Sequence, residues 1–222
     1  MSEVLSASLQ NRPQHRNSPV FEPKWRASRG FTMIEVMFAV LVVMIVSAMA
    51  IYQMQPSVQQ ARANAGMAET VSAFRQAQAY AVAYRRFVQI TFPNYPGTTA
   101  NQIEITVKNS MTPNAGADVV LQTLTLEGSD VFQLTTGMPD TPDAFGNADA
   151  IEFEGVSGTP TAGMFFQPDG TLVDSGGNYV NGTCFLAING FASSARAVTV
   201  LGSTGHVKSY HTNGISTWFQ AY

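Results

Sequence analysis

One apolar run constrains this chain more than any other feature of its sequence. From Phe31 to Tyr52 the only charged residue is Glu35, and the only other polar side chains before the run ends are Thr32 and Ser47. A helix of about 20 residues, rising ~1.5 Å per residue, matches the ~30 Å hydrocarbon core of a bilayer. The run is longer than the apolar core of an ordinary signal peptide. An isolated ionised carboxylate inside such a segment is costly, so we expect Glu35 to have a partner.

The residues at the start of this run resemble the processing site of type IV prepilins and pseudopilins. They read Gly30-Phe31-Thr32-Met33-Ile34-Glu35. In that family a prepilin peptidase cuts after the glycine and methylates the new N-terminal residue. The resemblance implies cleavage between Gly30 and Phe31, N-methylation of Phe31, and pairing of Glu35 with the N-terminal amine of a neighbouring subunit. An ammonium and a carboxylate would then neutralise each other inside an apolar bundle, where either one alone would be costly. The alternative is a plain signal anchor with an accidental glutamate.

The charges are distributed unevenly along the chain. Residues 1–30 hold five of the twelve Lys and Arg residues and two of the fifteen acids, so the remainder has a formal charge of −6. Three prolines and no hydrophobic period mark residues 1–30 as a removable leader. A basic leader before an apolar run predicts that the leader stays cytoplasmic. The resemblance places the chain in the bacterial inner membrane as a single-pass protein, with its C-terminal domain in the periplasm.

Helical spacing continues beyond the apolar run to about Tyr84. We expect residues 31–52 to span the membrane and residues 53–86 to extend the same helix as an amphipathic segment, with Pro56 as a possible kink. The face expected to pack on the rest of the chain is rich in alanine. It comprises Val58, Ala61, Ala65, Ala68, Val71, Ala79 and Val82.

From residue 87 the hydrophobic period changes to two, and turn residues become frequent. Strands at short spacing with no intervening helix predict antiparallel sheets, so residues 87–222 form the β part of an α+β fold. The segment Thr135–Asn147 predicts a longer surface loop with no readable role. The expected strands are Phe87–Phe92, Gln102–Lys108, Val119–Leu126, Val131–Leu134, Ala150–Phe153, Gly163–Gln167, Thr171–Val173, Thr183–Ile188, Arg196–Leu201 and His206–His211.

Three stretches of this β region and the preceding helix are similar to the GspH/FimT-like minor pseudopilins and minor pilins. They are the helix end Phe74–Ala81 with the strand Phe87–Ile90, the hairpin Phe165–Thr171, and the closing hairpin formed by Ala197–Val200 and Gly205–Lys208. The resemblance implies a pilin-like subunit that helps to initiate or cap a type II secretion pseudopilus or a type IV pilus. Its partners would be the prepilin peptidase, other pilins or pseudopilins, and the inner membrane.

A DNA-binding minor pilin for natural transformation is the alternative function. Some members of this branch carry a Gly-Arg-x-Arg pattern in the last hairpin that is linked to DNA binding, whereas this chain has Gly205-His206-Val207-Lys208. Arg196 and Lys208 are the candidate phosphate contacts. Two basic residues on an acidic domain provide only weak electrostatic attraction for the phosphates of a nucleic acid.

The sequence supplies no motif for catalysis, for a metal or for a cofactor. Gly-x-Ser-x-Gly, His-Glu-x-x-His and phosphate-binding glycine loops are absent, although an enzyme domain on a membrane stalk stays open as a further alternative. His206 and His211 lie five residues apart on one expected strand and would face opposite sides of the sheet. Cys184 is the single cysteine, so no intramolecular disulfide can form, and its strand context predicts a buried apolar residue.

Overall fold

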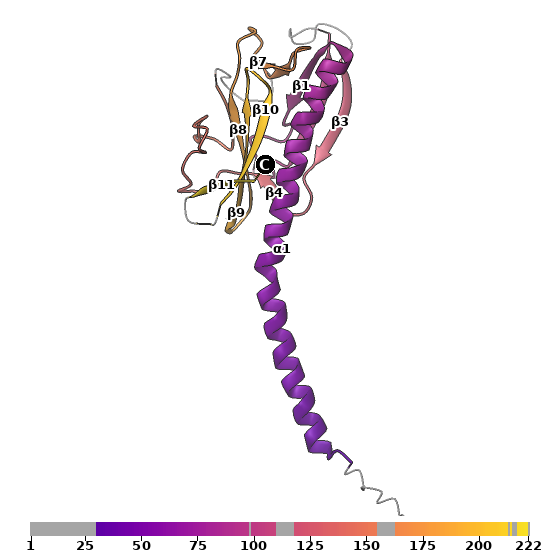
Figure 1. The fold of residues 1–222 in the computed structure, drawn as a ribbon. Coiled ribbons are helices and arrows are strands. Elements are labelled where there is room, and N and C mark those ends of the chain that lie inside the picture. The colour runs from indigo at the N-terminus through magenta and orange to yellow at the C-terminus, as the bar shows by residue number, and fades with distance from the viewer. Residues whose placement is uncertain are drawn as a thin grey trace, which may run out of the picture. The chain divides into compact units, whose positions relative to one another are not determined.

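The computed structural model describes residues 30–97, 99–109, 118–154, 163–212, 214 and 217–221 (Figure 1). The leader expected in residues 1–30 thus lies outside the described residues, except for Gly30. The structure divides after Ser47 into two parts, which are taken separately below. The expected fold class is confirmed, because one long N-terminal helix is followed by antiparallel sheets.

The helix α1 spans Met33–Tyr84 and continues through Pro56. Proline has no N–H to donate to the carbonyl four residues earlier, so one helical hydrogen bond is missing there. The helix ends in a Schellman motif, in which Arg85 takes a φ of 54° and the N–H of Arg86 donates to the carbonyl of Ala81 at 3.2 Å. The change of hydrophobic period therefore predicts the helix end correctly.

Eleven strands follow in the described part of the chain and form two antiparallel sheets. The order is β3-β2-β1-β6-β7 in the first sheet and β11-β10-β9-β8-β4 in the second, where β5 also pairs with β8. Each expected strand overlaps an observed one. The strands are β1 Phe87–Thr91, β2 Gln102–Lys108, β3 Val119–Thr125, β4 Asp130–Phe132, β5 Ile151–Phe153, β6 Phe165–Phe166, β7 Leu172–Val173, β8 Gly182–Ile188, β9 Phe191–Leu201, β10 His206–Thr212 and β11 Trp218–Gln220.

The core of the second part joins the helix to both sheets. Phe74 of α1 is fully buried, and its ring centroid lies 6.3 Å from that of Phe153 in β5. Phe92 and Phe132 meet edge to face with their centroids 5.0 Å apart. Such aromatic pairs stabilise by about 0.5–1.5 kcal/mol beyond the area that they bury.

The helix face that packs on this core differs from the expected one. Of the expected face only Val71 is buried, while its alanines are exposed. Alanine is small enough to occur on either side of a helix, so an alanine-rich helix has two rows at the same spacing. Met67 and Phe74 decide which row is buried, because they bury far more apolar surface. The buried residues of α1 are Ala63, Gly66, Met67, Thr70, Val71, Ala73, Phe74, Ala77 and Ala81.

Gln78 ties the end of the helix to two turns of the β region. Its amide Nε2 donates to the carbonyl of Gly170 at 2.9 Å and to the carbonyl of Thr204 at 3.1 Å. Within the first turn, Asp169 accepts bonds from the N–H and hydroxyl of Thr171 at 3.0 and 2.7 Å. The three stretches that resemble the minor pilin branch therefore meet around one glutamine.

The segment Thr135–Asn147 covers the outer face of the second sheet. The indole N–H of Trp218 donates to the carbonyl of Pro139 at 2.9 Å, and Met138 packs on the cluster of Phe185, Ala195, Ala197, Tyr210 and Trp218. Phe185 of β8 belongs to this cluster while Cys184 and Leu186 belong to the main core, and all seven residues of β8 are buried. A second, smaller core thus lies beneath what the sequence suggests is a free loop. The strand β11, which brings Trp218 there, was not expected.

Candidate processing and assembly site

Thr32 and Glu35 begin the helix together. The hydroxyl of Thr32 accepts a hydrogen bond from the N–H of Glu35 at 3.3 Å, and its carbonyl accepts one from Val36 at 3.2 Å. This is the position and spacing of a capping box, in which a Thr caps the helix and an acid follows three residues later. A carboxylate in the first turn is also favoured by the positive end of the helix dipole. Capping and the helix dipole therefore explain why an acid is favoured near this terminus. They do not explain why the acid lies next to an apolar run long enough to cross a bilayer.

Gly30 precedes the helix and touches nothing that would require a glycine. A Cβ built at this position meets no atom of the described structure within 4 Å, and its φ is not in the left-handed region. Gly66 contrasts with it, because a Cβ there would lie 2.6 Å from a carboxylate oxygen of Asp130. The fold thus needs glycine at position 66 and tolerates any small side chain at position 30.

The apolar segment that follows is exposed along its whole length. Its large apolar side chains between Phe31 and Tyr52 are 42–85% exposed. The most apolar 18-residue window of α1 has a mean hydropathy of 2.7 and no buried residue, so by length and composition the helix can cross a membrane. Apolar surface on this scale marks a site for lipid or protein contact.

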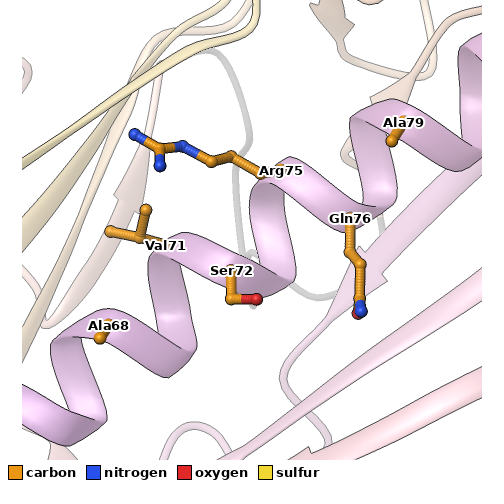
Figure 2. Close-up of a pocket in the computed structure, with 6 residues that line it drawn as sticks. All are labelled: Ala68, Val71, Ser72, Arg75, Gln76 and Ala79. Carbon is orange, nitrogen blue, oxygen red and sulfur yellow. The ribbon is translucent and has the colours of Figure 1, made fainter.

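A shallow groove follows the solvent side of the second half of α1. Figure 2 shows Ala68, Ser72 and Ala79 along the helix, with Arg75 and Gln76 extending from it in different directions. The groove has a volume of ≈ 440 Å³ and is mostly apolar. Small side chains at such spacing let another helix approach closely. Ala68 and Ala79, two alanines of the row that was expected to face the core, therefore line this groove.

Arg196, the first candidate DNA contact, is buried. Only 3% of it is exposed; its Nε donates to Asn64 at 2.8 Å, and its Nη1 donates to the carbonyls of Ser193 and Ala195 at 3.1 and 2.9 Å. Burial lowers the pKa of this guanidinium, and the charge of Asp130 raises it. Arg196 therefore holds β9 to α1, and little of its guanidinium surface is exposed for contact with a phosphate.

Lys208, the second candidate, pairs with Asp143 of the Thr135–Asn147 segment. Its Nζ lies 2.5 Å from Oδ1 of Asp143, and Oδ2 of the same carboxylate accepts bonds from the hydroxyls of Thr199 at 2.6 Å and Tyr210 at 2.8 Å. Burial raises the pKa of Asp143, but the hydrogen bonds from Lys208, Thr199 and Tyr210 outweigh it, so this pKa lies below its ordinary value.

Asp143→Asn is expected to destabilise the β domain by about 1–3 kcal/mol at pH 7, because three donors lose their charged acceptor. A depressed carboxyl pKa gives stability that is present above the unfolded pKa of about 3.9 and is lost as the pH falls through the folded pKa. The difference between wild type and variant should therefore shrink below about pH 4. Thermal unfolding in detergent micelles, followed by circular dichroism, measures it.

Asp118→Asn serves as the matched control for that variant. It removes an ion pair with Lys108, 2.6 Å long, at the end of the β2–β3 hairpin. Surface pairs of this kind contribute about 0–1 kcal/mol. Equal losses in the two variants would contradict the anchoring role of Asp143.

The other chemically active side chains do not converge. Cys184 is buried as expected, and burial raises the pKa of its thiol. His211 stacks on Phe219 with ring centroids 5.6 Å apart, while His206 lies at the far end of β10. Among the described residues no three His, Cys, Asp or Glu side chains are grouped so that they could hold a metal ion.

Comparison with known proteins finds one family model. Residues 25–51 match the prokaryotic N-terminal methylation motif, whereas no curated protein matches. The solved structures similar to this chain include the minor pseudopilin EpsH from the type 2 secretion system of Vibrio cholerae, at 11% identity over 68% of this chain and 97% of that one, with a TM-score of 0.41.

Two further solved structures show a similar degree of likeness. The type IV minor pilin FimU of Pseudomonas aeruginosa is 13% identical over 70% of this chain and 90% of that one, with a TM-score of 0.41. The solution structure of E. coli GspH is 13% identical over 73% and 89%, with a TM-score of 0.30. At these scores the likenesses carry no argument, so the assignment depends on the N-terminal motif. The chain thus carries the prokaryotic N-terminal methylation motif at the start of an apolar helix that leads into antiparallel sheets.

Proposed function

We propose that the chain is a minor pseudopilin or minor pilin that helps to initiate or cap a type II secretion pseudopilus or a type IV pilus. The observation that carries the proposal is the exposed apolar segment of α1 directly behind the methylation motif. A fully exposed run of this length must be covered by lipid before assembly and by other helices after it. The protein then acts by assembly and has no turnover chemistry.

Processing supplies the group that assembly needs. Prepilin peptidase cuts between Gly30 and Phe31 and methylates Phe31, and the new amine becomes the partner of Glu35 in a neighbouring subunit. The basic leader stays in the cytoplasm and the β domain faces the periplasm, as the positive-inside rule favours. The open surroundings of Gly30 support this reading, because the fold places no demand of its own on that position.

The groove of Figure 2 is the second contact surface in this proposal. Its small residues at helical spacing fit the side of a neighbouring subunit's helix, and Arg75 and Gln76 at its edges can bond to polar groups there. The groove lies on the face of α1 that the β domain leaves uncovered, so a second helix can reach it without unfolding the subunit.

Ser72→Trp tests this surface. The indole fills the groove, and overpacking of a close helix contact costs about 1–3 kcal/mol, which corresponds to an incorporation that is lower by about tenfold. The control is Ser203→Trp, the same change at an exposed position in the turn between β9 and β10. Subunit incorporation is measured by affinity purification of filaments from cells. Equal incorporation of the two variants at equal membrane levels would argue against the groove as a contact.

The experiment for the function as a whole is crosslinking in native membranes with a C-terminal tag, followed by mass spectrometry of the partners. Recovery of other pseudopilins with a secretion ATPase platform supports a pseudopilus subunit. Recovery of a major pilin with pilus assembly proteins supports a pilus subunit. Recovery of neither would remove the filament proposal and leave only the processing motif.

A further inference from the structure

Asp130, at the start of β4, is buried and has no hydrogen-bonding partner in the part of the chain that the structure describes. Only 1% of the residue is exposed, and neither carboxylate oxygen accepts a hydrogen bond from a described residue. A buried ionised carboxylate that accepts no hydrogen bond is strongly disfavoured, and such a group neutralises itself by taking up a proton. None of the roles described above requires a carboxylic acid here.

The carboxyl group of Asp130 lies directly against the backbone of α1. A Cβ added to Gly66 would lie 2.6 Å from its Oδ2 and 3.2 Å from its Cγ, so only glycine leaves room for it. Gly66 is itself buried, between Ala63 and Met67 on the packed face of the helix. The acid therefore occupies the seam between the helix and the second sheet, where any gain of charge or water has to separate them.

Charged groups of both signs face this carboxyl group without forming an ion pair with it. Glu69 and Arg62 come from α1 and Arg196 from β9. The Oε2 of Glu69 is likewise buried and has no donor among the described residues. The stem of Arg62 lies over Gly128, in the turn before β4, where a built Cβ would be 3.4 Å from its Cδ. Arg196 is already bonded to Asn64 and to two carbonyls.

The balance of these groups favours the protonated acid below about pH 6. Burial is the largest effect and raises the pKa of Asp130 to about 6; the charge of Arg196 lowers it, that of Glu69 raises it, and that of Arg62 lowers it again. The two arginines thus reduce the cost of the anion without removing it. At pH 7 most Asp130 side chains are therefore ionised even while the seam is closed.

We propose that Asp130 is a proton-controlled contact that holds the Gly66 region of α1 against β4 when it is protonated and releases it when it is ionised. Loss of the proton to solvent leaves a buried anion, and opening of the seam admits the water or the Arg62 guanidinium that the anion needs. Acid therefore favours the closed seam, and a rise to neutral pH favours opening. The helix segment on either side of Gly66 is then the adjustable part of the subunit, while the segment around Phe74 stays fixed.

The direction with pH follows from the two states of the acid. In the closed seam the pKa is about 6, and in the open seam it returns to about 3.9. A raised carboxyl pKa means that closure is favoured below the open-state value and is weakened as the pH rises through the closed-state value. Opening should therefore increase about tenfold between pH 5 and pH 7 and change little above that.

Hydrogen–deuterium exchange of the full chain in detergent micelles tests this inference. After correction for the intrinsic pH dependence of exchange, amides of residues 63–69 should exchange about tenfold faster at pH 7 than at pH 5. Amides of residues 74–81, packed on the main core, serve as the internal reference and should show no such step. Asp130→Asn should give a flat profile, and Glu69→Gln should move the midpoint of the wild-type step to lower pH.

Two results would overturn the inference. One is a flat wild-type profile, or the same step in Asp130→Asn. The other is a carboxyl titration of Asp130 by carbon-13 NMR with a midpoint near 4, which needs no variant and so remains decisive if a variant fails to fold. Glu104→Gln, which changes an acid on β2 that does not face Asp130, must leave the step unchanged.

Discussion

Gly30→Val is expected to abolish processing and leave the full-length chain in the membrane. A peptidase that cuts between Gly30 and Phe31 must accommodate the extended backbone next to the cut, and a branched side chain restricts both the conformation and the approach. The substitution meets no neighbour in the described structure, so it should not disturb the helix. Gel mobility of the membrane fraction, followed by mass spectrometry of the N-terminus, distinguishes the two forms.

The matched control is Ala48→Val, which places the same side chain further along the exposed helix. It should be cut and methylated as in the wild type. Mature, methylated protein at wild-type levels in Gly30→Val would show that the cut lies elsewhere or that no cut takes place at this motif.

Glu35→Leu is expected to give a subunit that is cut, methylated and inserted but rarely incorporated into a filament. Without the carboxylate, the methylated amine of a neighbouring Phe31 has no counter-charge in an apolar bundle. Removing one partner from a buried ion pair costs about 3–5 kcal/mol. Even a third of that cost lowers incorporation about tenfold. Quantitative recovery of the tagged subunit with sheared filaments measures the effect.

Val40→Leu provides the control for this effect, since it changes an exposed apolar residue of the same run and keeps the charge pair intact. A second comparison, Glu35→Gln, separates charge from shape, because glutamine keeps the length of the side chain and loses the anion. Wild-type incorporation of both Glu35 variants would leave the carboxylate with its local role in the capping box alone.

The N-terminal helix could be predicted from the sequence because its determinants are local. Thr32 and Glu35 mark the start of the helix, and the apolar run around them has the length of a membrane span. Together with Gly30 and Phe31 they also form the processing motif. All described strands except β11 could likewise be predicted from the sequence, because alternation and turn residues act over a few positions. β9 begins earlier than expected, at Phe191, since the mixed small residues that follow it carry no clear alternation.

The packing face of the helix could not be read in the same way. Ala68 and Ala77 are chemically identical, yet one lines an exposed groove and the other is fully buried. Which row is buried depends on contacts with strands far away in the sequence, above all those of Phe74. Periodicity shows that faces exist, and only tertiary contacts decide which of them is covered.

The same limitation applies to the basic residues. Arg196 and Lys208 carry the charge that a nucleic acid needs, and the sequence shows nothing of their protein partners. Asn64 lies 132 residues from Arg196, and Asp143 lies 65 residues from Lys208. Long separations of this kind have no signature in a single sequence.

The cover formed by Thr135–Asn147 has a consequence for how proteins of this kind diversify. A loop that is free in solvent can change in length and composition independently, but this one completes a core with Trp218 and holds Lys208 and Tyr210 through Asp143. Substitutions in Thr135–Asn147 must be matched by substitutions on β10, so the two regions are expected to evolve together. New binding specificities would then arise on other surfaces, and a lineage that alters this loop alone would lose folded protein before it gained a partner.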